Sequence, residues 1–275
     1  MIKTISILIA VTCLVYTVVP NLDMKNKPYS TITHKNITEL SGIIRADRPG
    51  EFWGHNDKGN LPALYRFTLQ GKIAQTVLLD KAQNSDWEAI TRDDKGNLYI
   101  GDIGDNNKNR KQYTVYRIPH PAPAAKKAAS VAHIRYRYPG GDSHNCEAMF
   151  YFKNSLYFIT KETKKNANPS LFRLSELAEH RISSAQSVGK IKLEGSVSDA
   201  AVSDNGTYMA ILTDDYLYLS GIQSEKDMLK KPDIRHKIDF GNCEGLCFDE
   251  DQLVITNENG NIWFFSINEL LNTSP

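Results

Sequence analysis

The chain has 275 residues, enough for one large domain or two of ordinary size. Its apolar fraction of 41% supports a substantial hydrophobic core and excludes an intrinsically disordered chain. Lys and Arg number 33 against 32 Asp and Glu, so the chain lacks the basic excess typical of nucleic-acid-binding proteins, and we expect no nucleic-acid partner. Four cysteines without a CxxC pair argue against a disulfide scaffold or a zinc ribbon.

The N-terminus carries an apolar segment behind a positive charge. Lys3 is followed by sixteen uncharged, mostly apolar residues at 4–19. This pattern is typical of a signal peptide and is slightly short for a membrane span. No clear A-x-A cleavage site follows, so residues 1–22 are expected to be a signal peptide or an uncleaved N-terminal membrane anchor. In either case we expect an exported protein that is periplasmic, on the cell surface or secreted.

The rest of the chain is a series of short apolar runs separated by Gly, Asn and Asp, which is typical of β-strands joined by turns. Five segments align with one another: LSGII (40–44), WEAIT (87–91), CEAMF (146–150), SDAAV (198–202) and CEGLC (243–247). Each is followed by two further apolar runs, and the first four repeats end on a fourth run. A four-stranded unit that recurs about every 50 residues predicts a β-propeller.

We therefore expect an all-β, monomeric propeller that occupies residues 27–270 as a single domain. Five blades are the leading count, and six are the alternative if one of the longer repeats contains another blade. The fifth repeat lacks its fourth strand, and the spare run at residues 30–34 can supply it. Such pairing would close the ring and remove two open sheet edges.

Polar residues recur at the start of the first strand and at the end of the second strand of each repeat. Because these strands are antiparallel, both positions lie at the same face of the ring, which we call the mouth. The strand starts carry Ser41, Glu88, Glu147, Asp199 and Glu244. The strand ends carry Asn56, Asp102, Lys161, Asp214 and Asn257.

Six of these ten side chains are carboxylates and one is a lysine. Two carboxylates ~6 Å apart repel by roughly 3 kcal/mol at an effective dielectric constant of about 20. The set therefore requires protonation, strong hydrogen bonds or a cation, and a hard divalent ion with oxygen ligands, Ca²⁺ first, satisfies it. The expected metal ligands are Glu88, Glu147, Asp199, Glu244, Asp102 and Asn56. The structural alternative is that these acids accept hydrogen bonds from backbone N–H groups of neighbouring blades.

Four further residues of the mouth are candidates for binding a ligand: Lys161, Asp214, Asn257 and His55. Lys161 is the only cation among the ten positions, so it is expected either to pair with Glu147 or to hold an anionic ligand. Cys146 and Cys243 are expected to be buried thiols, and Trp87 is expected to pack in the core.

Several motifs carry a family resemblance: HND (55–57), DWEAI (86–90), GDIGDN (101–106) and NCEAM (145–149). Together they resemble exported bacterial β-propeller proteins that are related to the phytase-like (esterase-like) propellers and, more loosely, to the SdiA-regulated propeller family. The resemblance runs from about residue 38 to 265. It implies a propeller with a cation near the central channel and no assigned activity. The acidic mouth departs from the basic face that phytase chemistry requires.

Two classes of function follow. The first is a non-catalytic exported propeller that binds a small molecule, a glycan or a protein through its loops. The second is a calcium-dependent hydrolase of a lactone or a phosphoester, in which the cation polarises an oxygen atom and a free carboxylate acts as base. The fold hosts both classes, so an unshared carboxylate beside the metal would favour the enzyme. No G-x-S-x-G motif is present, which argues against a serine hydrolase.

Overall fold

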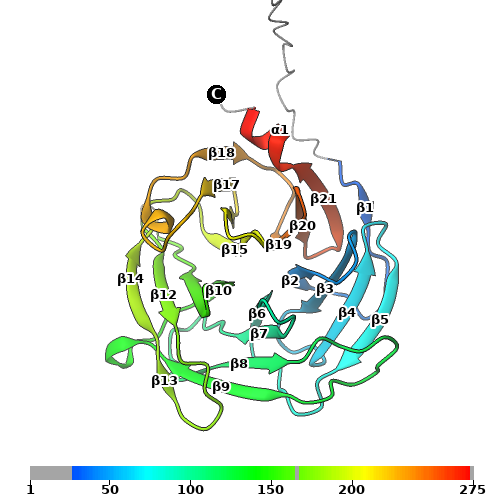
Figure 1. Cartoon of the computed structure of the whole chain (residues 1–275), viewed down its shortest axis with the longest axis horizontal. Helices are drawn as coiled ribbons and strands as arrows, with labels where there is room; N and C mark the ends of the chain where they lie inside the picture. The colour runs from blue at the N-terminus through cyan, green and yellow to red at the C-terminus, as the bar shows by residue number, and fades with distance from the viewer. Residues whose placement is uncertain (1–26, 165–166, 273–275) are drawn as a thin grey trace, which may run out of the picture.

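A computed structural model describes residues 27–164 and 167–272. In this part of the chain, five antiparallel four-stranded sheets stand around a common axis, and one of them carries an additional short strand (Figure 1). The molecule is a five-bladed β-propeller, so the five-blade prediction is confirmed and the six-blade alternative is wrong. The expected signal peptide or anchor at residues 1–22 lies outside the described residues. Among those described, no helix has the length and apolar character needed to cross a membrane.

Each blade is built from strands that follow one another outward from the axis. The innermost strands are β2 (Leu40–Arg45), β6 (Trp87–Arg92), β10 (Cys146–Phe152), β15 (Val197–Val202) and β19 (Cys243–Asp249). The second strands are β3 (Glu51–Asn56), β7 (Leu98–Asp102), β11 (Ser155–Thr160), β16 (Tyr208–Thr213) and β20 (Gln252–Asn257). The third strands are β4 (Ala63–Thr68), β8 (Tyr113–Ile118), β12 (Ser170–Leu174), β17 (Tyr216–Gly221) and β21 (Asn261–Ser266). The outermost strands are β5 (Ile73–Leu78), β9 (Ala132–Arg137), β14 (Gln186–Lys190), β18 (Ile234–Lys237) and β1 (Ser30–Thr31).

The ring closes in the last blade, where chain segments from both ends of the sequence meet. Strand β1 pairs antiparallel with β21, with Ser30 opposite Ile262 and Thr31 opposite Asn261. Figure 1 shows β1 on the outer side of β21, and the short C-terminal helix α1 (Ile267–Asn272) follows β21 directly in the chain. The predicted closure is confirmed, although the strand covers two residues of the expected run at 30–34.

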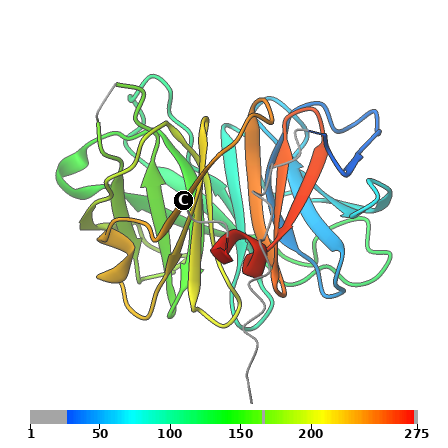
Figure 2. The same cartoon turned by 90° about the horizontal axis from the view of Figure 1, so that it is seen from above.

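The remaining elements are short. Strand β13 (Ser183–Ser184) adds in parallel to β9 of the second blade. Two single-turn 3₁₀ helices span Pro139–Gly141 and Asp227–Leu229. Seen from the side, the strands run between two faces of the ring that carry the loops (Figure 2).

Apolar side chains of adjacent blades pack against each other to form the core. Trp53 of the first blade and Trp87 of the second belong to one cluster, and both are fully buried. The prediction that Trp87 is a core residue is confirmed. Cys146 and Cys243 are buried free thiols, as expected, and Cys247 is a third. This packing between blades holds the innermost strands in place at the mouth.

Candidate functional site

A β-bulge interrupts every innermost strand close to the mouth. In each case one residue has no partner on the second strand. These bulge residues are Gly42, Glu88, Glu147, Ser198 and Glu244. A bulge redirects the side chains around it, so the three glutamates occupy one structural position in three blades.

The sequence alignment is one residue out of step in the first and fourth blades. Asp199 follows the bulge residue Ser198, and Ser41 precedes the bulge residue Gly42. Because successive residues of a strand point to opposite faces, Asp199 is directed differently from Glu88. The register also places Thr160 and Thr213 opposite the bulges, so Lys161 and Asp214 lie one residue past the ends of their strands.

The carboxylate of Asp199 is used inside the fold. Its Oδ1 accepts a hydrogen bond from the backbone N–H of Ala200 at 2.8 Å, and its Oδ2 accepts one from Leu246 of the neighbouring blade at 2.7 Å. Burial raises the pKa of Asp199 well above its ordinary value, and these two bonds oppose that rise. Both oxygens therefore fit the structural alternative, in which a ring acid joins two blades.

Two other predicted metal ligands, Asn56 and Asp102, and the candidate ligand-binding residue Asn257 are also engaged by neighbouring groups. The amides of Asn56 and Asn257 donate to loop carbonyl oxygens at 2.6 Å and 2.9 Å. Asp102 accepts a charge-assisted bond from Arg110 Nη1 at 2.9 Å. Burial raises the pKa of Asp102, while the Arg110 charge opposes this. These side chains shape the loops of the mouth.

The described residues contain one group of acidic side chains close enough to share a cation: Asp57, Asp86 and Glu88. One carboxylate oxygen from each lies within 4.8 Å of the others. Asp57 follows strand β3 of the first blade, and the other two stand at the start of β6 in the second blade. We call these three residues the acidic cluster. It contains one of the six predicted ligands, Glu88.

The local chain geometry explains how the cluster forms. Asp86 and Glu88 are two residues apart, so an extended chain turns both toward the same side. Gly104 packs directly against both carboxylates, where a Cβ atom would collide with them. Its backbone N–H donates to the carbonyl oxygen of Asp86 at 3.1 Å, which holds the loop against the strand. Asn84 Nδ2 donates to the carbonyl oxygen of Asp57 at 2.8 Å and so ties the first blade to the second.

The cluster is electrostatically crowded, and two of its residues, Asp86 and Glu88, are buried while Asp57 is partly exposed. Burial, and then the charges of Glu147, Asp57 and Asp86, raise the pKa of Glu88 well above its ordinary value. Burial likewise raises the pKa of Asp57. Lys58 Nζ lies 3.2 Å from Asp86 Oδ1 and 4.0 Å from Asp57 Oδ2, and half of its side chain is exposed. A half-exposed ammonium therefore provides the nearest positive charge.

Glu147 continues the line of charges along the mouth. It accepts a hydrogen bond from Asn145 Nδ2 at 2.8 Å, and its Oε2 lies 3.4 Å from Lys161 Nζ. Burial lowers the pKa of Lys161, but Glu147, Glu244 and Glu88 outweigh this and raise it. The ion pair expected between Lys161 and Glu147 is therefore present.

A chamber of about 730 Å³ opens on the same face between the third, fourth and fifth blades. Lys161, Asp214 and Glu244 line it together with the bulge residue Ser198, whose buried Oγ has no hydrogen-bond partner among the described residues. Burial, with the nearby Glu258 and Glu147 charges, raises the pKa of Glu244 to about 8. In the described part of the chain, the Glu244 side chain makes no hydrogen bond or ion pair.

In the first blade the bulge residue is Gly42, and the His55 ring lies beside it. Its ring is fully buried, its Nδ1 contacts the carbonyl oxygen of Asn56 at 3.1 Å, and a Cβ atom on Gly42 would collide with its Nε2. Burial lowers the pKa of His55 to about 4, so the imidazole is neutral at physiological pH. The ring fills the space that a glutamate takes in other blades.

No protein-family model and no curated protein matches this sequence. Among solved structures, the chain is similar to a chain of the nidogen/laminin complex, with a TM-score of 0.49 and 8% sequence identity. The match covers 84% of this chain and 77% of that chain. The assignment of the fold depends instead on the sheet order and closure described above.

Sequence reasoning missed Asp57 and Asp86, although both stand in motifs that it singled out. Asp57 ends HND (55–57) and Asp86 begins DWEAI (86–90). The available signal was the spacing of Asp86 and Glu88, which places two carboxylates on one side of a strand. The approach of Asp57 from another blade carries no such local signal.

Proposed function

We propose that this protein is an exported β-propeller that binds a Ca²⁺ ion at the acidic cluster and a hydroxyl-rich small molecule, such as a glycan, in the chamber on the same face. The observation that carries the proposal is the convergence of Asp57, Asp86 and Glu88 from two blades, with oxygen atoms within 4.8 Å. Calcium–oxygen bonds of about 2.4 Å allow ligands on opposite sides of the ion to be up to about 5 Å apart.

The charges around the cluster support a cation. Three carboxylates that share a buried site repel one another unless they are protonated or neutralised. Against three carboxylates, the half-exposed side chain of Lys58 supplies one positive charge. The cluster residues and Gly104 also lie within HND, DWEAI and GDIGDN, the motifs of the resemblance to phytase-like and SdiA-regulated propellers, which implies a cation near the channel.

The composition of the chamber supports a polar, uncharged or cationic ligand. Two lysines and five acidic residues line it, the latter being Asp214, Asp215, Asp239, Glu244 and Glu258. Its volume falls in the roughly 300–1,000 Å³ range of small-molecule sites. A ligand rich in hydroxyl groups can donate to these carboxylates, whereas an anion would be repelled.

The decisive experiment is thermal unfolding of the purified protein in chelator and in Ca²⁺. At a hundredfold excess over the dissociation constant, Ca²⁺ should stabilise the fold by about 2.7 kcal/mol. Glu88→Gln should abolish this response. Glu39→Gln, an exposed acid at the same face that bonds Asn60 Nδ2, is the matched control and should retain it. Equal melting temperatures in chelator and Ca²⁺ would contradict the proposal.

One observation favours the alternative, a calcium-dependent hydrolase of a lactone or a phosphoester. Glu244 has a pKa of about 8 and no hydrogen bond or ion pair among the described residues. Such a carboxyl group exchanges protons near neutral pH, as a general acid or base must. The ion, when bound, would supply polarisation of the substrate oxygen.

A substrate screen separates the two candidates. Under the hydrolase hypothesis, turnover of lactones or phosphoesters requires Ca²⁺ and falls at least about a hundredfold in Glu244→Gln, while Ca²⁺ stabilisation is retained. Under the binding hypothesis, no member of the panel is turned over above the level of Glu244→Gln, and glycans still bind in Ca²⁺. The exported location is tested separately by fractionating cells that produce the full chain.

A further inference from the structure

On the face opposite the mouth, a group of charged side chains joins blades that are not neighbours. Asp204 lies in the turn between β15 and β16 of the fourth blade, and its Oδ2 accepts hydrogen bonds from Arg45 Nη1 at 2.6 Å and from Arg92 Nη2 at 2.8 Å. Arg45 ends β2 of the first blade, and Arg92 ends β6 of the second. The fourth blade packs against the third and the fifth, so Asp204 reaches across the axis of the ring (Figure 1).

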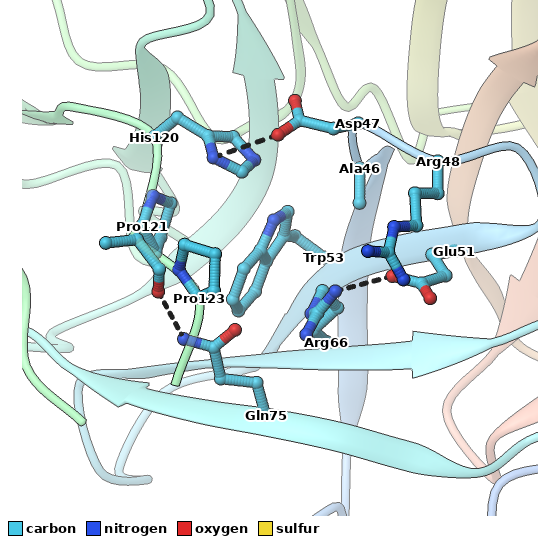
Figure 3. A pocket seen from close by; sticks show the side chains of 11 residues that line it. Ala46, Asp47, Arg48, Glu51, Trp53, Arg66, Gln75, His120, Pro121 and Pro123 are labelled. Carbon is cyan, nitrogen blue, oxygen red and sulfur yellow. Dashed lines mark hydrogen bonds and ion pairs between the residues drawn. The ribbon is translucent and has the colours of Figure 1, made fainter. Parts of the chain in front are cut away.

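Other charged groups of this face pair over shorter ranges. Figure 3 shows Arg66 beside Glu51, both in the first blade, and His120 of the second blade beside Asp47 of the first. The closest nitrogen and oxygen atoms of these two pairs lie 2.6 Å and 3.3 Å apart. These pairs act within one blade or between two adjacent blades, whose sheets already pack together. The contacts of Asp204 are different because they cross the ring.

The turn that carries Asp204 keeps its shape without these contacts. The N–H group of Gly206 donates to the carbonyl oxygen of Ser203 at 2.7 Å and so closes the turn on itself. In the described part of the chain, no other hydrogen bond or ion pair joins this turn to the first or second blade. The Asp204 side chain is 49% exposed, whereas those of Arg45 and Arg92 are 15% and 22% exposed. Water and salt ions reach the carboxylate, so the ion pairs can break while the turn stays folded.

A buried thiol lies close to the two arginines. Cys247 is fully buried. Burial and the charges of Asp249 and Asp199 raise its pKa well above the ordinary value, whereas the charges of Arg45 and Arg92 lower it. Cys247 and Asp249 are two residues apart on β19, so they point to the same side of the strand. Arg45 Nε lies 3.6 Å from Asp249 Oδ1 on that side, so Arg45 covers the approach to Cys247 from the face opposite the mouth.

We propose that Asp204, Arg45 and Arg92 form a latch that closes the end of the channel opposite the mouth and opens when its ion pairs are screened. While the latch is closed, solutes reach the channel from the mouth. When it opens, the turn of the fourth blade moves away from the first two blades, and small solutes reach Cys247. The latch lies on the other face of the ring from the acidic cluster, so this inference does not depend on the proposed function.

The proposal is tested by alkylating the full chain with iodoacetamide and measuring each cysteine by peptide mass spectrometry. Asp204→Ala should raise the rate at Cys247 roughly three- to twentyfold. Each exposed ion pair contributes up to about fivefold to the closing equilibrium, and alkylation of a buried thiol follows the population of the open form. Cys146, which is fully buried in the third blade, should keep its rate. An unchanged rate at Cys247 would overturn the proposal, as would an equal rise at both cysteines, which reports a general loss of stability.

A matched variant and a change of salt sharpen the test. Glu194→Ala also removes an exposed acid, which pairs with Arg235 of the fourth blade at 2.7 Å without crossing the axis, and should leave the rate at Cys247 unchanged. In 1 M NaCl the Debye length falls to about 3 Å, so Cys247 of the parent protein should be alkylated faster, while Asp204→Ala should respond much less. The proposal would also be overturned if salt left the parent rate unchanged, or if Glu194→Ala and Asp204→Ala raised the rate equally.

Discussion

Glu88 in the second blade and Asp199 in the fourth are both buried acids of innermost strands at the mouth, yet their surroundings are opposite. Asp199 accepts two backbone N–H bonds, one of them from the next blade. Glu88 stands beside Asp57, Asp86 and Glu147, and their charges add to the rise in its pKa. The difference arises from an offset of one residue. Glu88 is the bulge residue of its strand, whereas Asp199 follows the bulge residue Ser198 of its own strand. A buried carboxylate that faces backbone N–H groups therefore stabilises the fold, whereas one that faces other carboxylates is available to bind a cation.

The largest expected effect follows from removing Asp199. Asp199→Ala leaves two buried N–H groups without an acceptor, and each such group costs about 1–3 kcal/mol. Unfolding in urea should show a loss of about 2–6 kcal/mol, while the increase in stability on adding Ca²⁺ is retained. Asp199→Asn keeps one acceptor, so its free energy of unfolding should lie between those of the parent protein and of Asp199→Ala. A loss below about 1 kcal/mol in the alanine variant would mean that the two bonds do not stabilise the fold.

Gly104→Ala tests the other side of the comparison. The glycine has an ordinary negative φ, so backbone strain is not expected, but the new Cβ collides with the carboxylates of Asp86 and Glu88. We expect the Ca²⁺ stabilisation of about 2.7 kcal/mol at a hundredfold excess to be lost. Gly96→Ala, where a Cβ meets no atom within 4 Å, serves as a steric control, although its positive φ adds some strain. Unchanged calcium binding by Gly104→Ala in calorimetry would place the ion elsewhere.

The carboxyl groups with raised pKa values should also make the stability of the fold depend on pH. A carboxyl group whose pKa is raised on folding keeps its proton in the folded state and loses it in the unfolded state. The folded state therefore loses stability as pH rises through this window. For Glu244 the window runs from about 4.5 to about 8, so the metal-free protein should become less stable across it. Glu244→Gln should flatten this decline, and an unchanged profile would contradict the raised pKa.

Calcium binding should show the opposite trend. The ion binds carboxylates, so the raised pKa values of Glu88 and Asp57 mean that protons must leave before it binds. Affinity should rise with pH, by up to tenfold per pH unit for each displaced proton. Calorimetry in buffers of different ionisation enthalpy would measure the released protons. A pH-independent affinity would contradict this prediction.

The smallest expected effect concerns Lys58, which competes with the proposed ion. Removing its ammonium in Lys58→Gln should raise Ca²⁺ affinity by up to about fivefold, since exposed ion pairs contribute about 0.2–1 kcal/mol. Lys127→Gln, which breaks the exposed pair with Asp80 on another surface, should leave the affinity unchanged. Equal affinities in both variants would show that Lys58 does not occupy the site.

Much of the architecture could be predicted from local pattern. The strand repeat predicted five blades, and the spare run before the first repeat predicted the closure that β1 and β21 make. The pairing of Lys161 with Glu147 was one of the two alternatives that the sequence offered, based on their positions in paired antiparallel strands. These features depend on residues that are neighbours along a strand or across one pair of strands.

The residues of the mouth were predicted less well. The alignment matched Asp199 with Glu88, whereas the strand pairing matches Ser198 with Glu88. An offset of one residue reverses the direction in which a side chain of a strand points. The pairing with the second strand places the bulge of the fourth blade at Ser198, directly after the apolar residue Val197. Asp57 was missed for a related reason, since it reaches Glu88 only through the contact between the first and second blades.

By itself, the sequence determined the number of blades, the order of strands and the face at which acids gather, because alternation and repeat length are properties of consecutive residues. The tertiary structure alone decided which of those acids meet and which of them accept hydrogen bonds from the backbone. Each of these depends on the distance between residues of different blades. That distance is set by the packing of whole sheets around the axis, to which many side chains contribute.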